Sequence, residues 1–456
     1  MEEDIIVAIS TPPGRGGIGV VRVSGAGSLT IAQKLCPGRT RWVERMAQTC
    51  SVADAEGRPL DDAVVTYFKG PRSYTGEDVV ELSCHGSPLV LDRVVRAALT
   101  LGCRAARPGE FTLRAFLSGR IDLTQAEAVV DLVNARTDAG AGLALLGLEG
   151  TLSKPVETLR SSLLDLLAHA TALVDFSEED IPALQVEDIV AHMEESREAL
   201  ASLLSGAHQG QVLTHGVSLA IVGSPNVGKS SLLNGLLRRD RAIVTDIPGT
   251  TRDTLEEDLD LGGVPFRVID TAGMTATSDP VEAIGISRSR LALESAGMAL
   301  VVLDGSRQLE AADREILELA AGAVPAEALL VAINKNDLPQ ALSPSDLGSA
   351  VPAAQVISTS AVAPDGLDEL RRRLPEAALA GPAPDGFVVS NARHIQSLDI
   401  ARDALSRGIE NLRAGLPLDI VSLDLRTAAE ALGSILGIDI GDEVLDRVFS
   451  RFCIGK

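Results

Sequence analysis

The chain has 456 residues, of which 45% are hydrophobic and 23% charged, and its formal net charge is −22 at pH 7. This length exceeds what one compact core usually holds, so we expect two or three domains. The composition is that of a globular protein, and no apolar run approaches the roughly 20 residues of a membrane-spanning helix. Residues 1–4 are acidic rather than basic as in a signal peptide, which predicts a cytoplasmic protein without a membrane association.

Cysteine usage and charge distribution narrow the functional classes. The five cysteines are scattered without a C-x-x-C pair, which argues against a disulfide framework or a structural zinc site and fits a reducing compartment. Residues 1–120 are nearly neutral, so the rest of the chain carries almost all the net negative charge. An acidic body repels a phosphate backbone, so we expect any nucleic acid to be bound mainly by a partner protein.

The first 118 or so residues predict a small α+β domain. Runs of β-branched or alternating residues bounded by Gly and Pro indicate strands at residues 5–9, 18–23, 62–68 and 78–84. Residues 88–101 have the apolar spacing of a helix.

Residues 122 to about 209 predict only helices, which we interpret as a scaffold bundle. A second helical run within this region covers roughly 186–206. One apolar face repeats at helical spacing in Leu159, Leu163, Leu166, Leu167, Ala170 and Val174.

From residue 216 buried strands alternate with helices, which predicts a doubly wound α/β domain with a largely parallel sheet. The predicted strands are VSLAIVG, PFRVID, MALVVLD, ALLVAIN and AQVISTS. Residues 379–386 indicate an exit linker. Beyond it Ser390 can cap a helix with an apolar face made of Ile395, Leu398, Leu405, Ile409 and Leu412.

Two further helical stretches, around 422–436 and 442–452, complete the chain. The economical interpretation is one helical bundle interrupted by the α/β domain. We therefore expect domains at 1–118, 119–212, 213–381 and 382–456, the second and fourth being two parts of one helical domain.

A phosphate-binding loop opens the α/β domain. Residues 223–230, GSPNVGKS, match G-x-x-x-x-G-K-[ST] and lie between a predicted strand and a helix. The glycines let backbone N–H groups surround the phosphates, and the helix N-terminus adds its positive dipole end. Lys229 would neutralise β/γ-phosphate charge, and the Ser230 hydroxyl would bind magnesium.

Four more motifs follow in the order and strand context of a guanine-nucleotide site. Residues 249–253, GTTRD, supply Thr251 as a second magnesium ligand, and residues 270–273, DTAG, end the strand FRVID. Asn334-Lys335-Asn336-Asp337 follows the strand ALLVAIN, and the Asp337 carboxylate can accept from both N1–H and the exocyclic amine of guanine. Adenine lacks that paired donor edge, so these motifs predict a GTPase. The predicted GTP-binding residues are Asn226, Val227, Gly228, Lys229, Ser230, Ser231, Thr245, Asp246, Ile247, Pro248, Gly249, Thr250, Thr251, Asp270, Thr271, Ala272, Gly273, Asn334, Lys335, Asp337, Ser360 and Ala361.

Two features bear on hydrolysis. Met274 follows the DTAG motif where Ras-like enzymes carry a glutamine that orients water, so another group must do this. Asn226 and the oxygen-rich stretch 245–250 suggest a monovalent cation that would supply the charge of an arginine finger. For Asn226, a simple hydrogen bond within the loop is the alternative.

The sequence resembles the MnmE (TrmE) family of tRNA-modification GTPases, in the TrmE-Era-EngA-YihA-Septin-like superfamily, along its whole length. The resemblance rests on residues 11–25, 70–86 and 107–129 and on the motifs GSPNVGKSSLLN, TDIPGTTRD, DTAGM, VEAIGI, NKND and the terminal CIGK.

This resemblance implies an N-terminal α+β domain that binds tetrahydrofolate and dimerises, a discontinuous helical bundle, and an inserted Ras-like GTPase domain. Members act as homodimers with the flavoprotein MnmG (GidA), which uses FAD and NADH, in a heterotetramer or larger complex. They install an aminomethyl or carboxymethylaminomethyl group at C5 of the tRNA wobble uridine. The one-carbon unit comes from 5-formyl- or 5,10-methylene-tetrahydrofolate, and potassium-dependent pairing of the GTPase domains activates hydrolysis.

Site residues follow from the same resemblance. Glu282, in VEAIGI, would position the attacking water, and Cys453 would take part in the uridine chemistry unless it is a packing cysteine. Potassium would be held by Asn226, Thr245, Thr250 and the carbonyl of Ile247. Folate would be bound by Arg22, Glu81, Arg120 and Lys456, where Arg120 departs from the lysine common in the family.

Two other functions share some of these features. A ribosome-assembly GTPase has the same nucleotide motifs but usually adds a basic RNA-binding domain. A folate-dependent one-carbon transferase regulated by GTP would act on tRNA without a partner.

Overall fold

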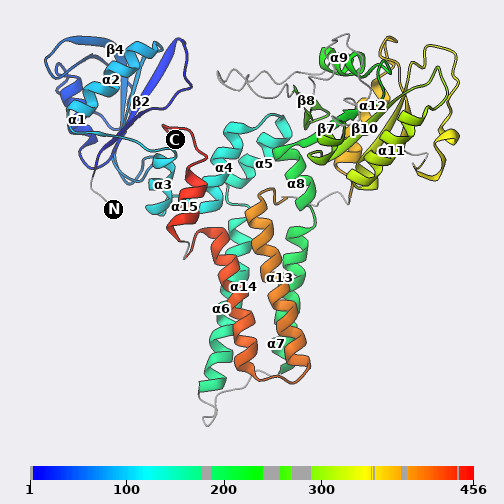
Figure 1. Cartoon of the computed structure of the whole chain (residues 1–456). Coiled ribbons are helices and arrows are strands. Elements are labelled where there is room, and N and C mark those ends of the chain that lie inside the picture. Colours follow the sequence, from blue (N-terminus) through cyan, green and yellow to red (C-terminus); the bar gives the residue numbers. More distant parts are fainter. Residues whose placement is uncertain are drawn as a thin grey trace. The chain divides into compact units, whose positions relative to one another are not determined.

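The computed structural model describes residues 4–175, 186–239, 257–269, 289–350, 352, 355–381, 388–438 and 441–456. The chain separates into two compact units, shown with the whole chain in Figure 1. The first comprises Met1–Val130, Gly147–Arg160 and Leu432–Lys456, and the second comprises Asp131–Leu146 and Ser161–Ala431. No described helix is both long and apolar enough to cross a membrane.

The first unit contains a six-stranded sheet in the order β3-β4-β5-β2-β1-β6, antiparallel except for the β1–β6 pair. All four predicted strands and the predicted helix are present. Its elements are β1 (Ile6–Ile9), β2 (Ile18–Ser24), α1 (Ser28–Leu35), β3 (Gln48–Ala53), β4 (Pro59–Phe68), β5 (Val79–His85), α2 (Pro88–Thr100) and β6 (Arg104–Ala105). The pattern analysis missed α1, β3 and β6, because β3 is a mostly polar edge strand with only Val52 and Ala53 buried, and the other two are short.

Helices α1 and α2 share one hydrophobic core with the sheet. Val21 and Val23 of β2, Leu82 of β5 and Val94 of α2 are all at most 1% exposed there. Because side chains alternate across a strand, Arg22 and Glu81 belong to the opposite face. That face therefore carries the polar residues predicted for ligand binding.

In the rest of the first unit, helices that follow the N-terminal sheet pack against the C-terminal segment. Helix α3 (Glu110–Leu117) and the beginning of α4 (Leu123–Asn134) pack with α15 (Asp442–Phe449) around a small core that includes Phe449 and Phe452. Gly109, at φ 66°, has no room for a side chain, because a Cβ there would meet the Phe449 carbonyl oxygen at 2.6 Å. The C-terminal residues are thereby fixed beside the N-terminal sheet.

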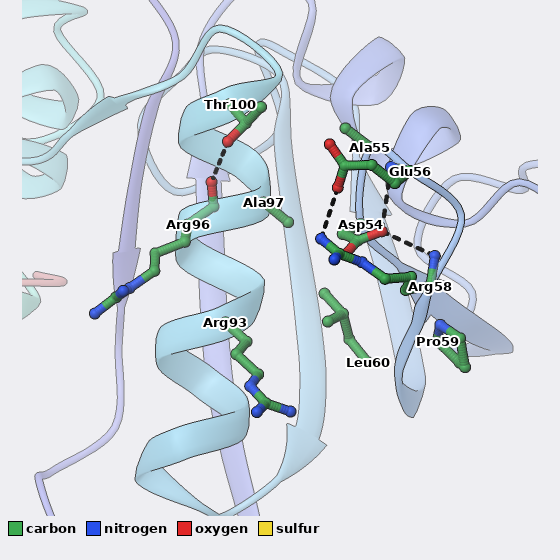
Figure 2. A pocket seen from close by; sticks show the side chains of 10 residues that line it. All are labelled: Asp54, Ala55, Glu56, Arg58, Pro59, Leu60, Arg93, Arg96, Ala97 and Thr100. Carbon is green, nitrogen blue, oxygen red and sulfur yellow. Dashed lines mark hydrogen bonds and ion pairs between the residues drawn. The ribbon is translucent and has the colours of Figure 1, made fainter.

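Figure 2 shows a pocket between α2 and the β3–β4 turn. Arg58 in this pocket is held by Asp54 and Glu56, at 2.7 and 2.9 Å. Arg93 and Arg96 of α2 line its other side. None of the predicted site residues lines this pocket, so the candidate sites lie elsewhere.

The second unit contains long helices that pack side by side. Helices α7 (Val186–Leu204) and α13 (Ala392–Arg413) meet where Gly408 faces Met193, and a Cβ at Gly408 would meet Met193 Cε at 2.5 Å. Leu163, Leu166 and Ala170 are buried, which confirms that part of the predicted face. Helix α8 (Ala207–His215) also belongs to this unit, whereas α5 (Asp138–Leu148), α6 (Ser153–Asp175) and α14 (Leu418–Leu436) contribute residues to both units.

The predicted cap of α13 is wrong by one residue. Asn391, not Ser390, is the N-cap, and its side-chain oxygen accepts from the Arg393 N–H at 2.9 Å. Either side chain is a suitable cap, so only the backbone path decides between them. Four of the five residues of the predicted apolar face of α13, Leu398, Leu405, Ile409 and Leu412, are buried, and the fifth, Ile395, is half-buried.

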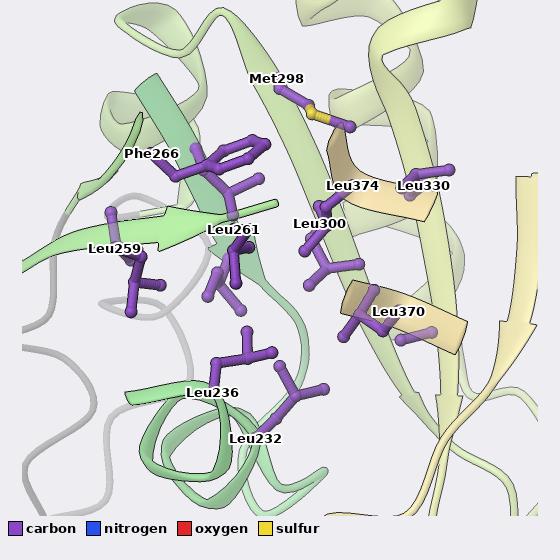
Figure 3. Close-up of a cluster of buried hydrophobic side chains, with 14 of the residues drawn as sticks. Leu232, Leu236, Leu259, Leu261, Phe266, Met298, Leu300, Leu330, Leu370 and Leu374 are labelled. Atoms are coloured by element: carbon purple, nitrogen blue, oxygen red, sulfur yellow. The ribbon is translucent and has the colours of Figure 1, made fainter. Parts of the chain in front are cut away.

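The second unit also contains a six-stranded sheet in the order β12-β11-β10-β7-β9-β8. It is parallel except for β8, so the predicted largely parallel α/β domain is confirmed. Figure 3 shows its core, in which Leu232, Phe266, Leu300 and Leu370 are at most 1% exposed. Its elements are β7 (Val217–Val222), α9 (Lys229–Arg239), β8 (Glu257–Leu261), β9 (Val264–Ile269), β10 (Met298–Asp304), α11 (Ala311–Ala323), β11 (Leu329–Asn334), β12 (Val356–Ser358) and α12 (Asp368–Ala378), with short 3-10 helices η2 (Ala326–Ala328) and η3 (Pro344–Ala350).

Candidate nucleotide-binding site

The phosphate-binding loop joins β7 to α9, as the motif predicts. A Cβ at Gly223 would meet the Val302 carbonyl oxygen at 2.3 Å, so the loop starts against β10 and tolerates only glycine. Helix α9 begins at Lys229, and the Lys229 ammonium donates to the carbonyl oxygens of Gly223 and Ser224 at 2.8 and 2.9 Å. Burial lowers the pKa of this ammonium. Burial thus disfavours the charged form of Lys229. A phosphate bound in the loop would favour it again, because its negative charge would lie next to the ammonium.

A buried acid that the sequence analysis missed supports this loop. Ser224 Oγ donates to Asp313 Oδ1 at 2.5 Å, and Arg307 donates to Asp313 Oδ2 at 2.7 Å. Burial works to raise the pKa of Asp313, but the hydrogen bonds from Arg307 and Ser224 hold it below its ordinary value. Asp313 also makes the capping box that starts α11. No sequence motif marks Asp313 as part of this site, since its position is also that of an ordinary helix-capping acid.

The base-recognition motif at the end of β11 contacts the phosphate-binding loop directly. The Asn334 side-chain amide donates to the Val227 carbonyl oxygen at 2.9 Å, and Thr359 Oγ1 donates to Asn334 Oδ1 at 3.3 Å. Asn334 is 2% exposed, so both polar ends of its side chain are paired inside the protein. A Cβ at Gly228 would meet Asn334 Nδ2 at 2.3 Å, which explains glycine at that position.

Lys335 is oriented by a second acid that the sequence analysis missed. The Lys335 ammonium lies 2.7 Å from Asp304 Oδ2 at the end of β10, and Lys335 has a φ of 65°. Burial works to raise the pKa of Asp304, but hydrogen bonds from Lys335 and Ser306 lower it overall, so the ion pair is maintained. Asp304 is the last residue of the predicted strand MALVVLD. Its place at the end of a strand was the one feature of the sequence that could have pointed to this site.

The carboxylate predicted to select guanine, that of Asp337, is held by the next motif along the sheet. Ser360 Oγ donates to Asp337 Oδ1 at 2.5 Å, and it accepts from the Ala363 N–H at 3.1 Å. Ser360 is buried, whereas Asp337 is exposed. This arrangement fixes a carboxylate that can accept from two parallel N–H donors, as guanine requires.

Several predicted residues lie outside the described part of the chain. These are Thr245, Asp246, Ile247, Pro248, Gly249, Thr250, Thr251, Asp270, Thr271, Ala272, Gly273 and Glu282. Ser230 and Ser231 are in the first turn of α9, and Ala361 directly follows Ser360. Asn226 is exposed with a φ of 63°. The structure thus assembles the phosphate-loop and base-recognition parts of the predicted site.

A second candidate site lies in the first unit, where the C-terminus meets β2 and β5. Arg22 donates through Nε to Glu81 Oε1 at 2.9 Å and through Nη1 to the Gly455 carbonyl oxygen at 3.4 Å. The same carbonyl accepts from Ser10 Oγ at 3.0 Å. Burial lowers the pKa of the Lys456 ammonium, and nearby Arg22 lowers it further while Cys453 opposes this. Three of the four predicted folate residues therefore lie together.

Aromatic rings and a special glycine complete this second site. The Arg22 guanidinium carbon is 5.2 Å from the centre of the Tyr74 ring and 5.5 Å from that of Phe111. Gly455 has a φ of 98°, and a Cβ there would meet the Ile9 carbonyl oxygen at 2.1 Å. Tyr74 and Phe111 were not predicted as residues of this site, because no local pattern distinguishes them from ordinary packing residues.

The remaining predicted residues are more peripheral. Arg120 is exposed, and within the described chain its guanidinium makes no hydrogen bond or ion pair. Cys453 is exposed. His85, at the end of β5, has its Nδ1 2.6 Å from Asp61 Oδ1. No three His, Cys, Asp or Glu residues of the described chain are grouped as a metal site would require.

Comparisons with known proteins find the same family along almost the whole chain. The family model of the MnmE helical domain matches residues 123–453, and that of the GTP-binding protein TrmE N-terminus matches residues 5–120. The tRNA modification GTPase MnmE of Alkaliphilus oremlandii is 41% identical over 462 residues, covering 100% of this chain and 99% of the relative. The proteins of the same name from Roseiflexus sp. and Chloroflexus aurantiacus are 43% identical (100% of this chain, 99% of the relative) and 44% identical (99% and 100%). Among solved structures, the G domain of the T. maritima FeoB iron transporter is 24% identical over 36% of this chain and 98% of its own, with a TM-score of 0.25.

Proposed function

The chain belongs to the MnmE family of tRNA modification GTPases, and from this premise we propose how its GTP hydrolysis serves the modification. With the flavoprotein MnmG, which brings FAD and NADH, it installs an aminomethyl or carboxymethylaminomethyl group at C5 of the tRNA wobble uridine. A tetrahydrofolate derivative supplies the one-carbon unit, and ammonium or glycine supplies the nitrogen. The partner binds most of the tRNA, because this chain has a net charge of −22.

The observation that carries the nucleotide part is the contact between its two recognition loops. Asn334 ties the base-recognition loop to the Val227 carbonyl at 2.9 Å, so phosphate and base contacts are held at a constant separation. Asp337, fixed by Ser360, selects guanine over adenine by its acceptor pair. GTP is therefore the nucleotide that this site fits.

The metal ions of the proposal act on the phosphates. Ser230 is in the first turn of α9, where a hydroxyl can bind a magnesium ion that also contacts the nucleotide, and Thr251 is the second proposed ligand. Potassium would be held by Asn226 with Thr245, Thr250 and the Ile247 carbonyl. The exposed Asn226 side chain fits this role, because its amide oxygen is accessible to a cation. Glu282 would then position the attacking water.

The second site has the donor set for a folate. A folate combines a ring edge of N–H donors with an anionic tail. The Glu81 carboxylate would accept from the ring, and Arg22 and Lys456 would neutralise the tail. When bound, the folate supplies a one-carbon unit. The chain's residues bind and orient the folate. The exposed Cys453, three residues before Lys456 in the sequence, is the proposed participant in the uridine chemistry.

The proposed architecture is that of the family. The N-terminal domain dimerises, and the GTPase domain is inserted into a helical domain. The packing of α7 on α13 supports the insertion, because the whole α/β sheet lies between these helices in the sequence. In the complex two copies of the chain join two or more of MnmG.

Reconstitution tests the proposal. Purified chain, MnmG with FAD and NADH, a folate donor, ammonium or glycine as the nitrogen donor, tRNA and GTP should yield the modified wobble nucleoside by mass spectrometry. Omission of MnmG or GTP should abolish it. Product from the chain alone would instead establish the partner-free folate transferase, and no product with every component present would refute the proposed function. The variant Asp337→Asn supplied with xanthosine triphosphate is the matched control, because it tests whether the nucleotide acts through this site.

A further inference from the structure

The N-terminal sheet contains a pair of thiols that the proposed function does not use. Cys36 directly follows α1, and its backbone N–H donates to the Ala32 carbonyl oxygen at 2.9 Å. Cys50 is in β3, the edge strand of the sheet, paired with Ala63 of β4. Arg39 ties the two segments together, because its backbone N–H donates to the Cys36 carbonyl oxygen at 3.0 Å and its guanidinium donates to the Thr49 carbonyl oxygen, next to Cys50, at 2.6 Å. Two cysteines 14 residues apart in the sequence therefore pack against the same core from neighbouring segments.

The two thiols differ in access to solvent. Cys36 is 0% exposed and belongs to the core formed by α1, α2 and the sheet, whereas Cys50 is partly exposed at the margin of that core. A small soluble oxidant can therefore reach Cys50, and Cys36 lies behind it. This order of access is that of an attacked thiol and a resolving thiol.

An arginine holds positive charge beside the pair. Arg39 donates to the Thr49 carbonyl oxygen at 2.6 Å and to Gln48 Oε1 at 3.2 Å, so its guanidinium is fixed at the start of β3. The hydrogen bond from Cys36, and then the charge of Arg39, lower the pKa of Cys50 although burial and Asp62 oppose this. The same contact and burial raise the pKa of Cys36. Because Cys50 is the more exposed thiol and lies next to Thr49, to which the Arg39 guanidinium is bonded, it is the better placed nucleophile of the two.

The third thiol nearby cannot replace Cys36 as partner. Cys84 is in β5, and β4 lies between β5 and β3 in the sheet. Two strand spacings put the backbones of Cys50 and Cys84 about 9–10 Å apart, beyond the roughly 7 Å limit for a disulfide. Burial first, and then Asp61, raise the pKa of Cys84 to about 12, so it is also a poor nucleophile.

We propose that Cys36 and Cys50 form a reversible disulfide when the protein meets a hydroperoxide. The Cys50 thiolate attacks one peroxide oxygen, the O–O bond breaks, and Cys50 becomes a sulfenic acid as hydroxide leaves. The Cys36 sulfur then attacks Cys50 Sγ, the S–O bond breaks, and the departing hydroxide takes the Cys36 proton as water. The sulfur pair is oxidised by two electrons, and the peroxide is reduced. A dithiol reductant restores both thiols.

The chain provides a convenient readout. Trp42, the only tryptophan, lies between the two cysteines in the sequence and packs against the same core, with the Arg39 guanidinium carbon 5.9 Å from its ring centre. Its fluorescence should change as the disulfide forms. Arg39, Arg41 and Arg45 place the two cysteines in different tryptic peptides, so only a disulfide joins them.

The experiment treats the full-length chain with hydrogen peroxide, blocks free thiols, and maps tryptic peptides with and without reduction. The expected result is a linked pair of peptides containing Cys36 and Cys50, formed together with a Trp42 emission change and reversed by dithiothreitol. Cys50→Ser should abolish the link and leave Cys36 reduced. The matched control Cys103→Ser should retain it, because Cys103 is a buried cysteine of the same core whose raised pKa has burial as its sole cause.

Cys36→Ser provides a second readout, since it should leave a Cys50 sulfenic acid that dimedone traps. If that variant does not fold, the result with Cys50→Ser decides. The proposal is overturned if Cys36 and Cys50 both remain alkylatable while the exposed Cys453 is oxidised, or if Cys50 links to any other cysteine.

Discussion

The side-chain amide of Asn334 donates to the backbone carbonyl of Val227 at 2.9 Å, which joins two loops 107 residues apart in the sequence. One loop is built to surround phosphates and the other to recognise a base. The hydrogen bond is buried, so water cannot replace it when it is lost. The separation of the two halves of the nucleotide site therefore depends on this contact.

Replacement of Asn334 by alanine should weaken GTP binding about tenfold or more. The Val227 carbonyl oxygen and the Thr359 hydroxyl would both lose a buried partner, at about 1–3 kcal/mol for each unsatisfied group. Titration of a fluorescent GTP analogue measures the loss. The exposed neighbour Asn336→Ala is the control and should bind normally, and equal affinities of the two variants would show that the contact is dispensable.

Asp337→Asn should exchange guanine for xanthine specificity. The amide cannot accept from both N1–H and the exocyclic amine, so GTP affinity should fall roughly 100-fold. Xanthine has a carbonyl in place of that amine and would accept from the new amide. Competition binding with the two triphosphates measures this exchange. An unchanged preference for GTP would mean that Asp337 does not contact the base.

GTP turnover should be stimulated by potassium over sodium at matched ionic strength, on the order of tenfold or more. Asn226→Gly should remove the selectivity and keep GTP affinity within about threefold. Glycine is the appropriate substitution, because Asn226 has a φ of 63° that alanine would adopt only with strain. Steady-state hydrolysis in both salts tests this. Equal rates in the unaltered protein would leave a GTPase without the proposed cation mechanism.

The N-terminal sheet should lose stability in acid through Glu110, which is 3% exposed and 2.6 Å from Arg104. Burial works to raise the pKa of Glu110, but hydrogen bonds from Arg104 and the Arg107 N–H hold it below its ordinary value of 4.5. A depressed carboxylate pKa contributes stability above the unfolded-state pKa, and that contribution is lost as pH falls through the folded-state value. Stability of this unit should therefore decrease as pH is lowered below about 5.

Glu110→Gln tests the origin of that decrease. This substitution should lower the free energy of unfolding by about 2–3 kcal/mol at neutral pH, because a neutral amide is a weaker hydrogen-bond partner for the arginines than a carboxylate. It should also make stability less dependent on pH in acid, because glutamine does not titrate. Urea unfolding followed by Trp42 fluorescence reports on this unit, where Trp42 packs. Glu56→Gln is the control, because its ion pair with Arg58 is exposed and its loss should leave the stability almost unchanged. An undiminished acid slope in Glu110→Gln would assign the effect to other carboxylates.

Gly455→Ala should impair folate binding by about tenfold or more while GTP hydrolysis without tRNA stays unchanged. The new Cβ would meet the Ile9 carbonyl oxygen at 2.1 Å, so the terminal segment must move away from Arg22. Calorimetric titration with 5-formyl-tetrahydrofolate measures this. Gly441→Ala is the matched control, because a Cβ there meets nothing within 4 Å. Full affinity in Gly455→Ala would separate the terminus from the folate site.

Much of the fold was predictable, because hydrophobic periodicity is a local property. The parallel strands β7, β9, β10, β11 and β12 are each an apolar run before a recognisable loop, and all five were predicted. The polar edge strand β3 was missed because its sequence has no such run. The cap of α13 was placed at Ser390 instead of Asn391, because both residues are good caps and only the backbone path distinguishes them.

The motifs predict which residues bind GTP, since they place glycines, a lysine and a carboxylate in a fixed order along the chain. The tertiary structure decided how they are held. Asp313 and Asp304 orient the site from α11 and β10, and no motif contains them. In the same way, only folding brings Gly455 to Arg22 across 433 residues. A motif is encoded over a few neighbouring residues, whereas such contacts depend on how whole elements pack, and no local pattern specifies that packing.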